Sequence, residues 1–177
     1  LPDFVKGRRW FAAKGEMIRR VALVDHVEWP HDGRSSLLAL VRVQTGEEGT
    51  PGDPYFLPLT LAWEDRDEER MKALAPAAIA KVRQQAEVGL LADAFGDESF
   101  CRSLVTAMGS ASALKSAHGT LSFHPTGEFE RIAGSELERQ QIVVPPAQSS
   151  NTIVALGERL FIKAYRRLQV GVNPEVE

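Results

Sequence analysis

The chain has 177 residues, of which 44% are hydrophobic and 25% are charged, so it has enough apolar material to form a folded core. Its formal net charge of -3 argues against a nucleic-acid-binding protein, and no apolar run approaches the roughly 20 residues that span a bilayer. The single cysteine, Cys101, excludes an internal disulfide; we expect a buried, unreactive thiol and a cytoplasmic protein.

The first predicted element lies in residues 1–15, where Arg8 and Arg9 stand beside two aromatic residues. We interpret this stretch as a short helix that pins Trp10 and Phe11 into a core. The two arginines would then satisfy acidic neighbours or strand-end carbonyls. The alternative is a binding patch formed by the arginines and Trp10.

Three strands are predicted next, at residues 17–29, 36–43 and 55–63, because β-branched and apolar residues run between turn signals. Pro58 favours an edge position or a bulge for the third strand, since proline cannot donate a ladder hydrogen bond. The charge-rich stretch that follows, EDRDEERMK, is typical of a solvated surface.

Residues 73–95 are ambiguous in their local pattern. Their alanine and arginine content suggests a helix, whereas alternating side chains around a turn at QQAEVG suggest two strands. A helix is clearer over residues 97–108, where five apolar residues recur at helical spacing and indicate a core-facing stripe: Phe100, Cys101, Leu104, Val105 and Met108. The four histidines lack metal-ligand spacing and are interpreted as surface or turn residues: His26, His31, His118 and His124.

The last third of the chain is predicted to be mainly β-structure. Residues 113–134 are expected to form a hairpin that turns at HPTG, with Leu121 and Phe123 facing Phe129. A modest domain boundary is expected where small residues cluster, near Ser110. Further strands are predicted at residues 141–144, 152–156 and 159–165.

The last of these strands carries a lysine, Lys163, on the same face as Phe161 and Tyr165. Burial of an ammonium group costs several kcal/mol without a partner. Glu177, or alternatively Glu175, could be this acidic partner. Both lie in the ending NPEVE, which resembles the first turn of a helix and suggests a fragment of a longer polypeptide. In protein-kinase-like folds such a pair orients the lysine onto nucleotide phosphates, whereas an ordinary hairpin with a snorkelling lysine is the alternative.

Two motifs resemble the bacterial maltokinase family. RRWFAAKG, residues 8–15, is similar to the RWFGGKG signature that opens maltokinases and the maltokinase domains fused to trehalose synthase. QSSNTIVALGERLFIKAYRRLQVGVNPEVE, residues 148–177, is similar to the family segment EQSNTSVVFGDRLFLKLYRRLxxGxNPExE. The two motifs stand at the two ends of the chain in the family's order, while the middle of the chain matches in pattern only.

The resemblance implies an α+β fold. Residues 1–110 would form a sheet-rich N-terminal cap with a packed helix, and residues 111–177 the antiparallel strands of a truncated N-lobe. That lobe would be protein-kinase-like, as in aminoglycoside phosphotransferases. The resemblance favours two strands over residues 77–95, because these caps are rich in β-sheet. It also implies ATP- and Mg²⁺-dependent phosphorylation of maltose to maltose 1-phosphate, for α-glucan synthesis.

The family's phosphate-contacting lysine matches Lys163, and its helix partner matches Glu177. The phosphate-side loop matches five residues: Gln148, Ser149, Ser150, Asn151 and Thr152. The chain departs from the family at Ala147, where the family has an acid, and at Ile153, where it has a serine. In the first motif Ala12 and Ala13 replace two glycines, which argues against a turn with positive φ there.

In this family the catalytic base and the metal-binding residues belong to the C-lobe, so we expect residues 1–177 alone to be inactive and to bind neither ATP nor Mg²⁺ appreciably. The expected partners are maltose and ATP in the full-length enzyme, the kinase C-lobe and a trehalose synthase domain, with no nucleic acid and no membrane. Two alternatives stay open: a related capped hexosamine (glucosamine) kinase, and a non-catalytic cap module that docks another domain.

Overall fold

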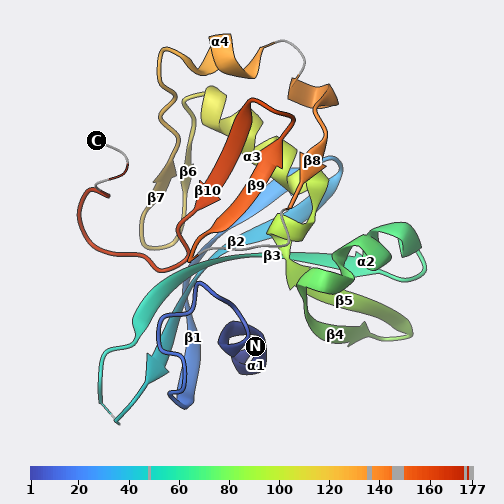
Figure 1. Cartoon of the computed structure of the whole chain (residues 1–177). Helices are drawn as coiled ribbons and strands as arrows, with labels where there is room; N and C mark the ends of the chain where they lie inside the picture. The colour runs from blue at the N-terminus through green and yellow to red at the C-terminus, as the bar shows by residue number, and fades with distance from the viewer. Residues whose placement is uncertain (48, 135–136, 145–149, 174, 176–177) are drawn as a thin grey trace.

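The computed structural model describes residues 1–47, 49–134, 137–144, 150–173 and 175. It is rich in β-sheet with few helices, consistent with an α+β fold (Figure 1). A five-stranded antiparallel sheet with the order β1-β2-β3-β5-β4 dominates the first half. Its strands are β1 (Ile18–His31), β2 (Arg34–Thr45), β3 (Asp53–Trp63), β4 (Ala78–Gln84) and β5 (Glu87–Asp93). The three strands predicted before residue 64 are therefore confirmed, as are the two strands predicted over residues 77–95.

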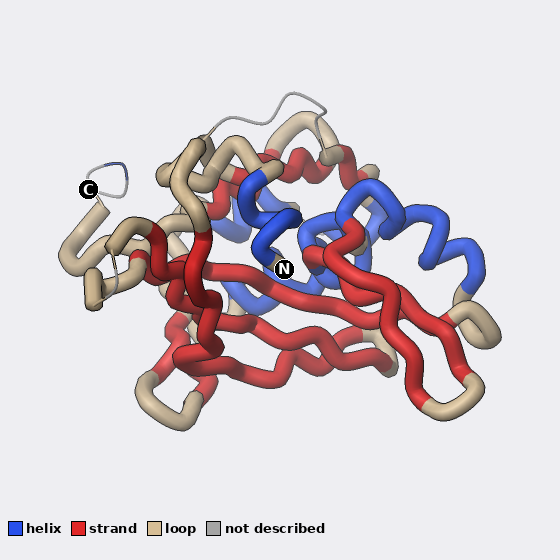
Figure 2. Tube along the Cα trace, turned by 90° about the horizontal axis from the view of Figure 1, so that it is seen from below, coloured by secondary structure: helices blue, strands red, loops and turns tan. Residues whose placement is uncertain are grey.

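One face of this sheet is covered by helix α1 (Pro2–Lys6) and the turn after it, as Figure 2 shows from below. Trp10 and Phe11 are 7% and 2% exposed, and both rings pack against Tyr55 at centroid distances of 5.7 and 5.8 Å. Alternation along β2 turns Ala39 and Val41 to the same cluster. The predicted pinning of the two aromatic rings is confirmed.

The second core lies where helix α3 (Glu98–Gly109) packs between residues of the five-stranded sheet and a three-stranded sheet. The smaller sheet has the order β10-β9-β8. Its strands are β8 (Ile142–Val143), β9 (Thr152–Leu156) and β10 (Leu160–Ala164). The predicted apolar stripe of α3 is confirmed, and Cys101 is fully buried, so burial raises the pKa of its thiol well above the usual range. Helix α2 (Glu68–Leu74) and the short turn η1 (Ala75–Ala77) connect β3 to β4, and the short turn η2 (Ala94–Gly96) connects β5 to α3.

The prediction of an edge position or a bulge at Pro58 is wrong for the strand as a whole, because β3 lies between β2 and β5 and pairs with both without a bulge. At Pro58 itself, however, β3 is paired only with β2, since the pairing with β5 begins at Leu59. The proline is tolerated because its nitrogen, which has no hydrogen to donate, lies between two pairing partners of β3. On that side of β3, Phe56 N donates to Arg166 O at 2.7 Å, whereas pairing with β5 begins only at Leu59. The backbone that follows β10 therefore runs beside the first half of β3.

The prediction of a hairpin that turns at HPTG is also wrong, because the turn lies earlier in the chain. The observed hairpin joins β6 (Ala113–Lys115) to β7 (Thr120–Ser122). Phe129 opens helix α4 (Phe129–Ala133) and is followed along the chain by the turn η3 (Leu137–Arg139). Phe129 packs so closely on Gly109, at the end of α3, that a Cβ there would lie 2.3 Å from its ring. This contact with α3 explains why the ring does not face Phe123 across a turn.

The interpretation of the histidines as surface or turn residues fails for His31, which is 6% exposed at the end of β1. Its two ring nitrogens lie 3.1 Å from Ser99 Oγ and 2.8 Å from Ser36 Oγ. Burial lowers the pKa of His31, so the ring is held neutral inside the core. No helix among the described residues is both long enough and apolar enough to cross a membrane.

Candidate functional site

Lys163 lies on the outer face of the ribbon that β9 and β10 form, opposite Ile153 in the ladder. The inner face carries buried side chains, Ile162 and Ala164 among them, whereas Phe161 is 66% exposed. The shared face of Phe161 and Lys163 is thus confirmed. The lysine is not buried as expected: its side chain is 41% exposed, because this face is not covered by other described elements.

A carboxylate holds the Lys163 ammonium group on this face. Lys163 Nζ donates to Glu175 Oε2, and the Tyr165 hydroxyl donates to the same oxygen at 2.5 Å. The hydrogen bond from Lys163 lowers the pKa of Glu175, and the hydrogen bond to Glu175 raises the pKa of Lys163, so each charge favours the other. Glu175 N donates to Asn173 Oδ1 at 3.0 Å, as expected for an N-capping asparagine.

The predicted partner Glu177 lies outside the described residues, so the observed pair uses the alternative, Glu175. Of the predicted phosphate-side loop, Gln148 and Ser149 also lie outside them, whereas Ser150 is exposed at the start of the following stretch. The geometry does not bring Thr152 to Lys163. Thr152 is 7% exposed and points to the inner face of the ribbon.

Thr152 instead joins a buried network centred on Arg166, a residue that the sequence analysis did not single out. Arg166 is 1% exposed; its Nε donates to Thr152 Oγ1 at 2.8 Å, and its terminal nitrogen donates to Asp93 Oδ2 at 2.5 Å. The network links β5 of the large sheet to β9 through Arg166, which lies just after β10, the strand that carries Lys163. A usable signal was present, because Arg166 continues the inward alternation of Ile162 and Ala164.

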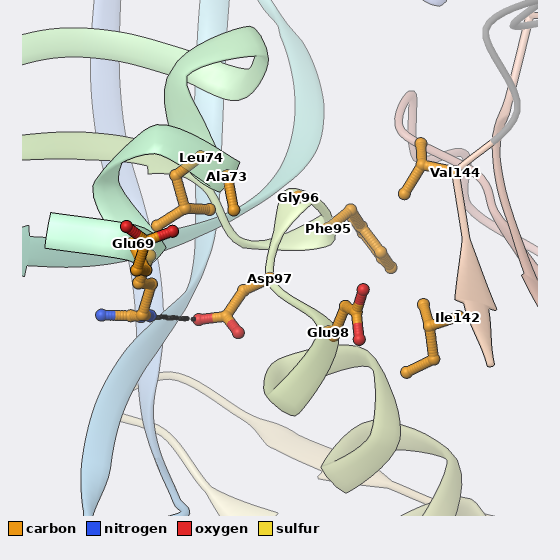
Figure 3. Close-up of a pocket in the computed structure, with 10 residues that line it drawn as sticks. Glu69, Ala73, Leu74, Phe95, Gly96, Asp97, Glu98, Ile142 and Val144 are labelled. Atoms are coloured by element: carbon orange, nitrogen blue, oxygen red, sulfur yellow. Dashed lines mark hydrogen bonds and ion pairs between the residues drawn. The ribbon is translucent and has the colours of Figure 1, made fainter. Parts of the chain in front are cut away.

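A hollow of about 430 Å³ opens between α2, the start of α3 and β8 (Figure 3). Arg70 donates to Asp97 Oδ2 through two nitrogens, at 2.9 and 2.6 Å, and Asp97 also caps α3 by accepting from Ser99 N. Burial opposes ionisation of Asp97, but the hydrogen bonds from Arg70 and Ser99 outweigh it and keep the pKa of this carboxyl low. Since its partly buried charges satisfy each other, we read this hollow as a structural junction. Arg70 was wrongly included in the solvated charge run.

The site therefore presents a cation on an open sheet face, held by a carboxylate and flanked by an exposed phenylalanine, and such a cation can contact the oxygens of an anion. The part of the chain that the structure describes contains no group of three His, Cys, Asp or Glu residues that could hold a metal.

A family model described as the maltokinase N-terminal cap domain matches residues 4–97, more than half of the chain. The match begins within α1, covers all five strands of the large sheet and ends at Asp97, the N-cap of α3. No curated protein matches the chain.

Proposed function

This chain belongs to the maltokinase N-terminal cap domain family, and from that premise we propose that it is the N-terminal part of an ATP-dependent sugar kinase. The parent enzyme would phosphorylate maltose to maltose 1-phosphate in the cytoplasm, with a trehalose synthase domain as a fusion or partner. Residues 1–110 would form the cap, and residues 111–177 the start of a protein-kinase-like N-lobe. Residues 1–177 alone would not transfer phosphate, because the family's catalytic base and metal ligands belong to the C-lobe.

The observation that carries this proposal is the ion pair between Lys163 and Glu175 on the open face of the ribbon. In the proposed enzyme Lys163 binds phosphate oxygens of ATP, and Glu175 and Tyr165 hold its ammonium group in place. When bound, ATP would supply the phosphoryl group. Lys163 contributes by compensating negative charge at a fixed position, which requires no reorganisation when the reaction occurs.

The test is made in the full-length kinase with Lys163→Ala. Loss of one fixed charge at a phosphate predicts a fall in kcat/KM of roughly 10²- to 10³-fold with maltose and ATP. Folding should be preserved, because the side chain is 41% exposed. Glu175→Gln should lower kcat/KM less, since it removes only the positioning group.

Lys72→Ala is the matched control. Lys72 is an exposed lysine whose ion pairs lie within α2, with Glu68 and Glu69. Equal rates for Lys163→Ala and Lys72→Ala would refute the phosphate role. Assays with maltose and with glucosamine, at equal ATP concentration, identify the sugar substrate. A preference for glucosamine would show that the enzyme is a hexosamine kinase and would refute the proposed maltokinase activity.

A further inference from the structure

A second cavity, of about 550 Å³, lies on the inner side of the ribbon, between the turn after α1 and the Arg166 network. Its lining combines three arginines, one carboxylate and apolar side chains. The charged members are Arg8, Arg9, Arg166 and Asp93. Ala73, Phe95, Gly96 and Val144, labelled in Figure 3, line both this cavity and the neighbouring hollow.

The guanidinium groups of two of the three arginines have no hydrogen-bond acceptor among the described residues. Arg166 is compensated by Asp93. Arg8 is half-buried with its guanidinium 3.9 Å from the centre of the Phe4 ring, and Arg9 is exposed. In the described ranges neither guanidinium group donates a hydrogen bond or forms an ion pair, so the expectation that these side chains satisfy acids or strand-end carbonyls is not met. The cavity therefore has two positive charges in excess.

This excess charge is costly for the protein without a ligand. Burial lowers the pKa of Arg8, Asp93 opposes that shift, and the neighbouring Arg166 adds to it. A half-buried cation is stabilised when an anion enters its site, because the anion restores the interactions that water provided.

We propose that this cavity binds the phosphoryl group of a small phosphate monoester. Such a group carries a charge of about -1.5 to -2 at neutral pH, which matches the two uncompensated arginines. Guanidinium groups bind phosphate oxygens in a bidentate manner. The apolar lining, Trp10 and Pro76 included, provides a wall for the organic part of the ester, and the volume lies within the usual range for small-molecule sites.

The site differs from the proposed nucleotide site because the ribbon separates them. Thr152 and Arg166 line the cavity from the inner face, whereas Lys163 occupies the outer face. A phosphate ester bound here would lie beside Thr152, the last residue of the proposed phosphate-side loop (residues 148–152), on the inner face of the ribbon. The cavity is therefore a binding site separate from the proposed nucleotide site, and its existence does not depend on the proposed activity.

The test measures binding by titration calorimetry, in 150 mM NaCl, in a chain of residues 1–177 that carries Lys163→Ala. That substitution removes anion binding on the outer face, so the outcome is independent of the proposed function. The probes are inorganic phosphate and phenyl phosphate. We expect both to bind saturably, and phenyl phosphate to bind more tightly because its ring contacts the apolar wall.

Arg9→Gln should weaken phenyl phosphate binding roughly tenfold, the loss expected for one charge-assisted hydrogen bond. Arg8→Gln should weaken it at least as much. Arg9 is exposed and makes no described polar contact, so its variant keeps the fold even if Arg8→Gln, which loses the contact with Phe4, does not. Arg20→Gln, an exposed arginine on β1, is the control and should bind as the parent does.

Two results would overturn the inference. One is the absence of saturable binding of either probe at millimolar concentration. The other is an equal loss in Arg9→Gln and Arg20→Gln, which would show attraction to net charge and no specific site.

Discussion

The ion pair between Asp93 and Arg166 is the most deeply buried charge interaction among the described residues, with side chains 9% and 1% exposed. Asp93→Asn tests it. Asparagine has nearly the size of aspartate and can still accept the hydrogen bond that Phe95 N donates to Asp93 Oδ1 at 3.1 Å. The substitution therefore isolates the loss of the negative charge and leaves the Arg166 guanidinium buried without its counter-ion.

The expected cost is about 3–5 kcal/mol of unfolding free energy, the usual penalty for removing one partner of a buried ion pair. Arg166 keeps its bond to Thr152 Oγ1 and a long one, 3.4 Å, to Phe56 O, but both acceptors are neutral. Urea denaturation with linear extrapolation measures the change. The double variant Asp93→Asn/Arg166→Met should recover most of the loss, because it removes the stranded charge as well.

Glu69→Gln is the control for this prediction. Its pair with Lys72 is exposed to solvent and should contribute little to the free energy of unfolding. If Asp93→Asn cost no more than Glu69→Gln, the pair would not hold the two sheets together. If the double variant were less stable than both single variants, the reasoning about a stranded charge would fail.

Two further predictions concern the core. Burial lowers the pKa of His31 below 6.5, so just below that pH the unfolded chain binds more protons than the folded one. The contribution of His31 to stability should be complete above about pH 6.5 and should fall as the pH drops. Urea midpoints that fall equally steeply with pH in the parent and in His31→Gln would contradict this prediction. Phe100→Ala should lower the free energy of unfolding by about 3–5 kcal/mol, because its ring is fully buried against Phe95. Phe161→Ala, on the open face, is the control and should change the urea midpoint little. Equal effects of the two substitutions would contradict the assigned core.

Hydrophobic periodicity accounts for the parts of the fold that the sequence predicted well. The strands before residue 64 and helix α3 bury apolar side chains at periods of two and 3.6 residues, so their pattern is local. The two strands over residues 77–95 required the family resemblance. Their local composition favours helix, and only pairing of β5 with β3 and β4 makes the extended form favourable.

Long-range packing accounts for the errors. The hairpin at HPTG was predicted from turn residues, but the place of Phe129 is decided by its contact with Gly109 on α3. Pro58 was assigned to an edge because a sequence cannot show that pairing on one side of β3 changes partner at that residue. His31 was assigned to the surface because its partners, Ser36 and Ser99, come from other elements.

The sequence by itself determined the chemistry available at the candidate sites: a lysine in an apolar strand with acids downstream, and an arginine pair beside Trp10. Only the tertiary structure decided which groups meet. It paired Lys163 with Glu175 on an open face, buried Arg166 with Asp93, and left Arg8 without an acceptor. The physical reason is that burial and pairing of a charge depend on residues far away in the chain, whereas periodicity is a property of neighbours.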